Sequence, residues 1–184
     1  DVLKALFGKE VQQELDIQAL SKVDVDAFTG IEIQEWPARI AEVAMWLMDH
    51  QMNVRLSEAF GLYFSRLPLR KAANIVLGNA LRLDWKTILP PDQCSYVLGN
   101  PPFVGKQFQE AAQKTDMKLI WGKVNGAGVL DYVTCWYAKA ADYIQGSAIC
   151  VGFVSTNSIS QGEQVGVLWS ALFQRGVNIH FAYR

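Results

Sequence analysis

Short apolar runs bounded by turn-forming residues alternate along the chain with stretches in which apolar residues recur every three or four positions. The runs predict buried strands, and the recurring stretches predict helices. Strands are expected over residues 24–33, 74–77, 95–99, 147–154 and 177–181. Because strand and helix alternate regularly, we expect an α/β fold with a doubly wound, mostly parallel sheet and right-handed crossovers.

The first long helix is expected after Pro37, which suits a first helical turn, with Glu35 near the positive end. Apolar residues spaced by three and four predict its core-facing stripe, which contains Ile40, Val43, Ala44, Leu47 and Met48. Residues 51–73 show no clean period, so we expect an irregular connection there. That connection carries a basic group expected to be solvated, namely Arg66, Arg70 and Lys71.

Two further helical patterns lie in the second half of the chain. Residues 131–144 form one, with Asp131 near its start. Ser160 and Glu163 match the S-x-x-E capping box, which opens a helix expected to stop at Gly176.

Residues 104–128 lack a clean period. We expect a mobile loop there, with a short helical piece over residues 117–121.

Composition narrows the class of protein. The chain has 184 residues, of which 51% are hydrophobic, so one domain with a sizeable core is expected. A formal net charge of −1 gives no overall basic field for gripping nucleic acid. No apolar run has the length of a membrane span and no signal peptide opens the chain, so we expect a cytoplasmic protein without membrane contact.

Three cysteines stand at unrelated spacings, at positions 94, 135 and 150. An odd number without a repeated spacing argues against a disulfide framework and favours reduced thiols. His50 and His180 add little toward a zinc site, so we expect no metal.

One of the expected strands ends in a stiff corner. Residues 95–99 are followed directly by Asn100-Pro101-Pro102-Phe103. Neither proline has an N–H to donate, each fixes φ at about −65°, and the residue before them is restricted to extended geometry. The carboxyl ends of strands in open α/β sheets are where ligands bind.

The corner suits a planar ring that carries an exocyclic amino group. The side-chain oxygen of Asn100 and the carbonyl of Pro101 can both accept hydrogen bonds from such a group, and Phe103 offers a face for stacking. Two acceptors on one amine leave its nitrogen lone pair more available for attack. An ordinary Asn-Pro turn after a strand is the alternative.

This corner and two earlier stretches resemble the motifs of S-adenosylmethionine-dependent N6-adenine DNA methyltransferases. Residues 28–33 (Phe-Thr-Gly-Ile-Glu-Ile) resemble motif II, residues 78–81 (Gly-Asn-Ala-Leu) motif III and residues 100–103 motif IV, in the gamma-type order. The stretches GIEIQEWPARIAEVAMWLMDHQMN, NIVLGNALRLDW and LGNPPFVGKQ resemble more closely the methyltransferase region of MmeI-like fused restriction–modification enzymes. The resemblance covers nearly the whole chain, and it implies an incomplete class I, Rossmann-like methyltransferase fold.

The resemblance also implies which residues bind the methyl donor, S-adenosylmethionine. Glu32 would accept hydrogen bonds from the donor's ribose hydroxyls, with Ile33 beside it. Asn79, where many relatives carry Asp, would hydrogen-bond the donor's adenine ring, with Ala80 next to it, and Asn100 would border the donor. The alternatives are a solvated acid at position 32 and a turn-forming asparagine at position 79.

The implied reaction is direct methyl transfer to the N6 amine of an adenine flipped out of double-stranded DNA, without a metal. Flipping costs a few kcal/mol, part of which stacking on Phe103 would offset. Asn100 and the Pro101 carbonyl would orient the amine and stabilise its developing positive charge. Lys106 could meet a DNA phosphate, but solvent contact is its simpler role. Asp131 and Tyr132 could border the donor, but core packing is the simpler role of Tyr132.

The family's glycine-rich motif I should precede motif II, but residues 1–28 contain a single glycine, Gly8. We therefore expect residues 1–184 to be a partial catalytic domain that spans motif II to about motif VII. Motif I, a target-recognition domain and a nuclease would lie outside it. Such a fragment is expected to bind the donor weakly, to be inactive alone and to be capable of self-association.

Two other interpretations stay open. Protein-glutamine and RNA methyltransferases also use an N-P-P-aromatic motif, so the substrate could be a different amine or amide. The chain could also be a non-catalytic module that contacts DNA or has a structural role.

Overall fold

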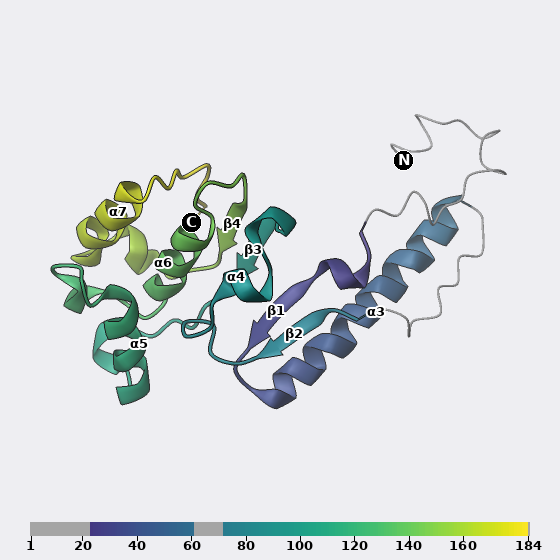
Figure 1. Cartoon of the computed structure of the whole chain (residues 1–184), viewed down its shortest axis with the longest axis horizontal. Coiled ribbons are helices and arrows are strands. Elements are labelled where there is room, and N and C mark those ends of the chain that lie inside the picture. Colours follow the sequence, from purple (N-terminus) through teal and green to yellow (C-terminus); the bar gives the residue numbers. More distant parts are fainter. Residues whose placement is uncertain (1–22, 61–71, 184) are drawn as a thin grey trace. The chain divides into compact units, whose positions relative to one another are not determined.

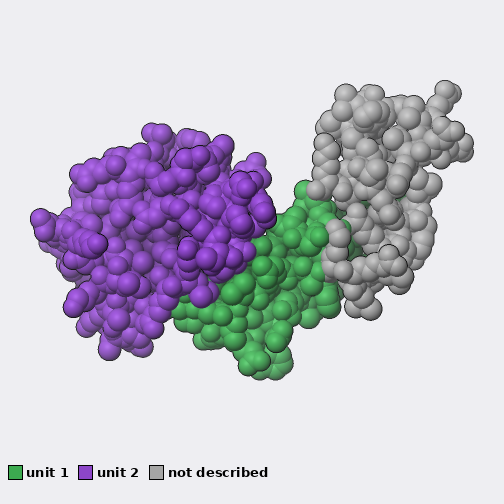
Figure 2. Space-filling model, in the orientation of Figure 1, with its two compact units in different colours: residues 1–79 green, residues 80–184 purple. Residues whose placement is uncertain are grey.

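The computed structural model describes residues 23–60 and 72–183, in which helices and short strands alternate (Figure 1). Contacts within the chain divide it into two units, residues 1–79 and residues 80–184 (Figure 2). The strands and α-helices are β1 (Thr29–Glu32), α3 (Glu35–Phe60), β2 (Asn74–Leu77), α4 (Trp85–Ile88), β3 (Tyr96–Gly99), α5 (Ala111–Trp121), α6 (Thr134–Tyr143), β4 (Cys150–Phe153) and α7 (Gln164–Gln174). The short 3-10 helices are η2 (Val25–Ala27), η3 (Pro91–Gln93), η4 (Lys106–Phe108), η5 (Ala127–Val129) and η6 (Asn157–Ser160).

In the first unit, β1 and β2 form a parallel pair, and α3 packs against both strands. The register runs from Thr29 opposite Asn74 to Glu32 opposite Leu77. The amide of Gly78 donates to the carbonyl of Glu32 (N···O 2.8 Å), which continues the ladder past the ends of both strands. The carboxyl ends of β1 and β2 therefore lie side by side.

Helix α3 differs from the expectation in its length and in the side that it buries. It continues to Phe60, through residues expected to be irregular, because neither glycine nor proline stands between Pro37 and Gly61. The stripe expected to face the core is instead exposed along its whole length: Ile40, Val43, Ala44, Leu47 and Met48. Ala38 is buried, and Ala41 and Met45 on the same side are half-buried. Because α3 is apolar on both sides, periodicity alone could not identify the covered one.

In the second unit, β3 and β4 form another parallel pair, with Tyr96 opposite Cys150 and Gly99 opposite Phe153. The core of this unit lies among α5, α6 and α7, and α6 packs against both of the other two helices. Its most fully buried residues are Leu81, Trp121, Leu130, Val133, Cys135, Leu168 and Leu172. Burying one leucine in this way contributes about 1.5–3 kcal/mol. One face of the strand pair remains open, since Tyr96 and Leu98 are 71% and 79% exposed.

The parallel direction expected of the strands is found in both pairs. The strands form two two-stranded sheets, so the structure supports an α/β arrangement with small parallel sheets. One continuous, doubly wound sheet stays a prediction.

Three of the expected strands are absent or shorter by several residues, and β3 is shorter by one. β1 begins at Thr29 rather than at residue 24, because the Asp24 side chain accepts from the Val25 amide (N···O 2.8 Å) and opens η2. β4 begins at Cys150, after a turn that contains Gly146 at a φ of 72°. Residues 177–181, expected to be a strand, are irregular.

Three helix starts also differ from the sequence expectation. Helix α6 begins at Thr134, three residues after the expected start at residue 131. Ser160 donates to the carbonyl of Asn157 within η6, so the expected capping box with Glu163 does not form and α7 begins at Gln164. Helix α5 begins at Ala111, six residues before the expected piece, with a capping box between Glu110 and Gln113. A glutamate in the first position of such a box is outside the usual Ser or Thr pattern.

The expected end of the helix at Gly176 is confirmed, since α7 ends at Gln174. This residue has a φ of 75°, which favours glycine, and its amide donates to the carbonyl of Phe173. The amide of Val177 donates to the carbonyl of Leu172, which completes a Schellman motif at the end of α7.

Apolar residues at rough helical spacing in residues 1–15 predict the tail of a helix, and that segment lies outside the described residues. The Arg66, Arg70 and Lys71 group lies outside them as well. No helix among the described residues is long and apolar enough to cross a membrane. Within the described ranges, no three His, Cys, Asp or Glu side chains gather where they could hold a metal ion. The three cysteines are free.

Candidate active site

The corner after β3 presents polar and aromatic groups to solvent. Asn100, Pro102 and Phe103 are exposed, Phe103 to 48%, whereas Pro101 is buried and anchors the turn. The amide of Val154 donates to the carbonyl of the residue before the corner (N···O 3.0 Å), so β3 and β4 stay paired up to it. Among the described residues, the side chain of Asn100 has no hydrogen-bond partner. Its amide is therefore available to a ligand.

Aromatic rings support the strand that carries the corner. A Cβ on Gly99 would lie 3.1 Å from the ring of Phe153, so the chain passes close to this ring directly before the corner. Phe153 contacts Tyr137 of α6 edge-on, with ring centroids 5.3 Å apart, and Tyr137 contacts Trp169 of α7 at 6.1 Å. Such pairs contribute about 0.5–1.5 kcal/mol each beyond their burial. Through Phe153, α6 and α7 thus support β4, to which β3 is paired.

Hydrogen bonds fix the segment that follows the corner. The carbonyl of Val104 accepts from the amide of Tyr132 (N···O 2.9 Å). The amide of Lys106 donates to Oδ1 of Asp131 (N···O 3.0 Å). The first part of the expected loop over residues 104–128 is therefore tied to the start of the α6 region, and the rest contains α5.

A buried carboxylate ties together three distant parts of the second unit. Oδ1 of Asp116 accepts from Nε of Arg82 (2.7 Å), and Oδ2 accepts from the hydroxyl of Tyr132 (2.8 Å). Burial and the neighbouring carboxylate raise the pKa of Tyr132 well above its ordinary value, so the hydroxyl stays protonated and donates. Tyr132 packs in the core, which was the simpler of its two expected roles.

The expected donor-binding residues of the first unit lie at one edge of the β1–β2 pair. Glu32 ends β1, and Oε1 of its carboxylate accepts from the amide of Gln34 (3.0 Å). Ile33 is exposed, and the half-buried Asn79 is the second residue after β2. The structure thus brings Glu32, Ile33 and Asn79 to neighbouring strand ends. Ala80 opens the second unit, where its carbonyl accepts from Nε1 of Trp85 (2.9 Å).

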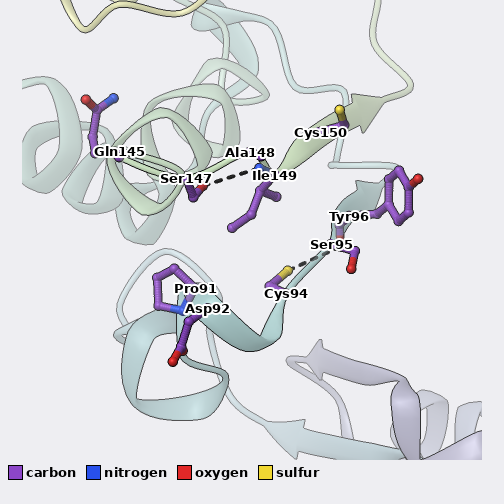
Figure 3. A pocket seen from close by; sticks show the side chains of 11 residues that line it. Pro91, Asp92, Cys94, Ser95, Tyr96, Gln145, Ser147, Ala148, Ile149 and Cys150 are labelled. Atoms are coloured by element: carbon purple, nitrogen blue, oxygen red, sulfur yellow. Dashed lines mark hydrogen bonds between the residues drawn. The ribbon is translucent and has the colours of Figure 1, made fainter.

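A cavity of about 700 Å³ lies at the opposite end of the β3–β4 pair, where both strands begin (Figure 3). Its walls come from the segment before β3, including Asp92 and Cys94, and from the turn before β4, including Ser147 and Ile149. Figure 3 shows the Cys94 thiol donating to the carbonyl of Tyr96 (S···O 3.4 Å) at its rim. The cavity is lined by none of the expected site residues: the corner follows the carboxyl end of β3, and Glu32, Ile33 and Asn79 belong to the first unit.

Two residues near the corner carry no sequence signal. Ser158 and Gln164 both donate to Oδ2 of Asp131, each at 2.7 Å. They stand 27 and 33 residues from Asp131 along the chain, so no local spacing links the three.

Comparison with known proteins identifies the family of the chain. Residues 3–184 match the family described as "MmeI, DNA-methyltransferase domain". DNA methyltransferase A of Bacillus subtilis (strain 168) is 40% identical over 165 residues, which is 88% of this chain and 19% of that protein. A solved structure of the Type IIL restriction–modification enzyme MmeI in complex with DNA is 52% identical, with a TM-score of 0.83 over 90% of this chain and 22% of that one. The chain therefore spans about a fifth of the length of these relatives.

Proposed function

Because the chain belongs to the MmeI DNA-methyltransferase domain family, we propose that it transfers a methyl group from S-adenosylmethionine to the N6 amine of adenine in DNA, within a restriction–modification enzyme. The observation that carries the proposal is the corner after β3. It offers an unpartnered amide at Asn100, the carbonyl of the buried Pro101 and the exposed ring of Phe103. Cytosine also has an exocyclic amine, so the choice of adenine rests on the resemblance of the motifs.

The residues at the β1–β2 edge fit the methyl donor. The Glu32 carboxylate has one oxygen bonded to the Gln34 amide, and its Oε2 has no partner among the described residues, so it can accept from a ribose hydroxyl. Asn79, on the adjoining strand end, can donate to and accept from an adenine ring. The donor supplies a sulfonium methyl group that is already reactive. Catalysis by this chain would therefore consist mainly of positioning.

The target base would be held by the corner. An adenine inside a duplex cannot present its amine to the corner, so it must be flipped out at a cost of a few kcal/mol. Stacking on Phe103 would offset about 1–3 kcal/mol of that cost. The Asn100 oxygen and the Pro101 carbonyl would accept from the two hydrogens of the amine and stabilise the positive charge that forms on its nitrogen. The methylated ammonium is acidic, so it can lose its proton afterwards without a general base acting earlier.

We also propose that residues 1–184 are part of a larger catalytic domain. In the full-length enzyme, a glycine-rich motif I would bind the methionine end of the donor, and a further domain would recognise the DNA sequence. The two parallel pairs would then belong to a doubly wound sheet of the class I methyltransferase type. Double-stranded DNA is the proposed partner of the full-length enzyme, and the 184-residue chain alone is expected to bind the donor weakly.

The test uses the full-length protein with tritiated S-adenosylmethionine and equal amounts of duplex DNA, RNA or protein as acceptor. Incorporation into DNA, with N6-methyladenine as the product after nucleoside digestion, is the expected result. Duplex already methylated at its adenines is the matched control and should accept no label. Label in RNA or protein, or N4-methylcytosine in the DNA digest, would contradict the proposal. The absence of donor binding and of methylation would favour a non-catalytic module.

A further inference from the structure

One carboxylate, that of Asp131, receives hydrogen bonds from three separate segments of the second unit. Its Oδ1 accepts from the amide of Lys106 (3.0 Å), in the segment that follows the corner. Its Oδ2 accepts from the hydroxyl of Ser158 in η6 (2.7 Å) and from Nε2 of Gln164 at the start of α7 (2.7 Å). The amide of Asp131 donates back to Oε1 of Gln164 (3.0 Å), so these two residues form a reciprocal pair.

These bonds connect the loops at the carboxyl ends of neighbouring strands. Lys106 lies beyond the end of β3, and Ser158 lies beyond the end of β4, which is paired to β3 along its length. Ser158 also shares a hydrogen bond with Thr156 (O···O 2.6 Å), three residues after β4. Asp131 therefore cross-links the two loops that border the exposed corner.

The cross-link acts on the backbone close to Phe103. The carbonyl of Val104 and the amide of Lys106 are both bonded to the Asp131–Tyr132 segment. The buried Gln109 donates its side-chain amide to the carbonyl of Leu130 (3.1 Å), which adds a third tie. On the other side of Phe103, two prolines fix the chain. The aromatic ring is therefore attached to a backbone that is held before and after it.

We propose that Asp131 and Gln164, the Asp131–Gln164 clamp, are positioning residues that hold Phe103 and the corner in the geometry required to receive the flipped base. This inference rests on the proposed function. The clamp touches neither base nor donor and acts through the 103–108 segment. A charged acceptor makes stronger hydrogen bonds than a neutral one, so a carboxylate suits a point where three segments meet. Misplacing a reacting group by about 1 Å can cost about 100-fold in rate.

The Lys106 side chain plays no part in the clamp. Its ammonium pairs with Glu163 (3.1 Å), and both side chains are largely exposed, so this pair contributes little. Only the backbone amide of Lys106 binds Asp131.

The test exchanges the chemistry of the two clamp residues. Asp131→Asn replaces one carboxylate oxygen with an NH2 group, which cannot accept a hydrogen bond. That NH2 group must face either the Lys106 amide or Gln164 Nε2, and both of these are donors. In Gln164→Glu, two carboxylates face each other. In the double variant, the new carboxylate at position 164 can accept from the backbone and side-chain nitrogens of position 131. The oxygen of the new amide at position 131 then accepts from the Lys106 amide. The variants are made in the full-length enzyme, and thermal melting verifies that each is folded.

For each single variant, we expect kcat for DNA methylation to fall about 10- to 100-fold, the loss typical of a hydrogen bond to a charged group, with an unchanged donor KM. We expect the double variant to regain activity to within about 3-fold of the parent, as coupled residues do. Ser158→Ala removes one donor to Asp131 and leaves the Asp131–Gln164 pair intact, so it should lower kcat less than the single clamp variants do. Asp142→Asn, which breaks the exposed Arg175–Asp142 pair elsewhere in the unit, is the matched control and should retain activity.

Hydrogen exchange provides a readout that does not depend on methylation. Peptides covering residues 103–110 should exchange faster in both single variants and return to the parent rate in the double variant. If the parent fails to methylate DNA while these exchange rates change as expected, the proposed function fails and the clamp stands. Unchanged exchange and unchanged kcat in Asp131→Asn would overturn the clamp. If the double variant loses as much kcat as the two single variants combined, the two residues are not coupled and the pairing is overturned.

Discussion

The two units give very different support to the site residues that they carry. In residues 80–184, three helices enclose a core that contains Leu168 at 0% exposure. An aromatic ring of α6 packs on Phe153 of β4, the strand paired with β3, and a ring of α7 packs on that α6 ring in turn. In the first unit, α3 packs on the β1–β2 pair while the opposite side of the helix exposes an apolar stripe that includes Leu47 at 57%. The proposed base-binding residues thus belong to a unit whose core is enclosed by three helices. The proposed donor-binding residues belong to a two-stranded sheet that one helix covers.

The difference between the units is tested most directly by truncating one leucine to alanine in each of them. Leu168→Ala should destabilise the protein by about 2–5 kcal/mol, because it removes fully buried contacts and leaves a cavity. Leu47→Ala should change stability by at most about 0.5 kcal/mol, as exposed substitutions do. Urea unfolding of the 184-residue chain measures both. If the two substitutions cost the same, the apolar side of α3 is covered and the units do not differ in the way described.

The same two leucine substitutions are then measured in the full-length enzyme, and their costs in stability are compared with those in the 184-residue chain. A large cost of Leu47→Ala there, combined with a small cost in the 184-residue chain, would mean that another part of the enzyme covers α3. A small cost in both would leave the stripe exposed in both.

The next largest effect should come from the corner itself. Asn100→Ala in the full-length enzyme should lower kcat about 10²- to 10³-fold, the loss seen when one preorganised polar group at a reacting centre is removed. Donor affinity should change little, since the proposed ribose and adenine contacts lie in the first unit and Asn100 would only border the donor. Single-turnover methylation and calorimetry measure the two quantities. Asn125→Ala, at an exposed turn of the same unit, is the control. Retained turnover would show that Asn100 has no role in the chemistry.

Local patterns predicted the parts of this structure that depend on neighbouring residues. Both ends of β2 and the carboxyl end of β3 followed from short apolar runs, and the end of α7 followed from Gly176. The exposed corner followed from two prolines that end a strand. In each case the deciding force acts within a few residues: a fixed φ, a missing N–H or a glycine at positive φ.

Features that depend on distant residues could not be predicted in this way. The covered side of α3 depends on what packs against it, and a helix with apolar residues on two sides gives no local hint. Gln164 and Ser158 converge on Asp131 across 33 and 27 residues. The expected capping box failed because Ser160 bonds to Asn157 instead, a competing local bond that a motif match does not reveal.

A carboxylate substitution in the first unit should separate donor binding from base binding. Glu32→Gln in the full-length enzyme should weaken S-adenosylmethionine binding by about 1.5–3 kcal/mol, or roughly 10- to 150-fold, because hydrogen bonds to a charged acceptor are lost. At saturating donor, kcat should stay near that of the parent. Calorimetry with the donor measures the first effect, and Glu58→Gln, on the exposed surface of α3, is the matched control. If Glu32→Gln lowers kcat at saturating donor and spares affinity, the division of labour between the units is wrong.

The smallest expected effect tests whether the exposed ring of the corner has the role assigned to it. Phe103→Ala should weaken binding of duplex with a flipped adenine by about 1–3 kcal/mol, the value of one stacked base, with donor affinity unchanged. Fluorescence of 2-aminopurine at the target position reports the stacked base, and its emission should rise when the ring is removed. Phe103→Tyr should behave like the parent because it keeps the stacking face. Phe181→Ala, which removes an equally apolar ring exposed at 72%, should leave the signal unchanged. If Phe103→Ala and Phe181→Ala give the same 2-aminopurine signal, Phe103 does not stack on the base. The corner is then ordinary exposed surface, and the well-packed core of the second unit does not serve base binding.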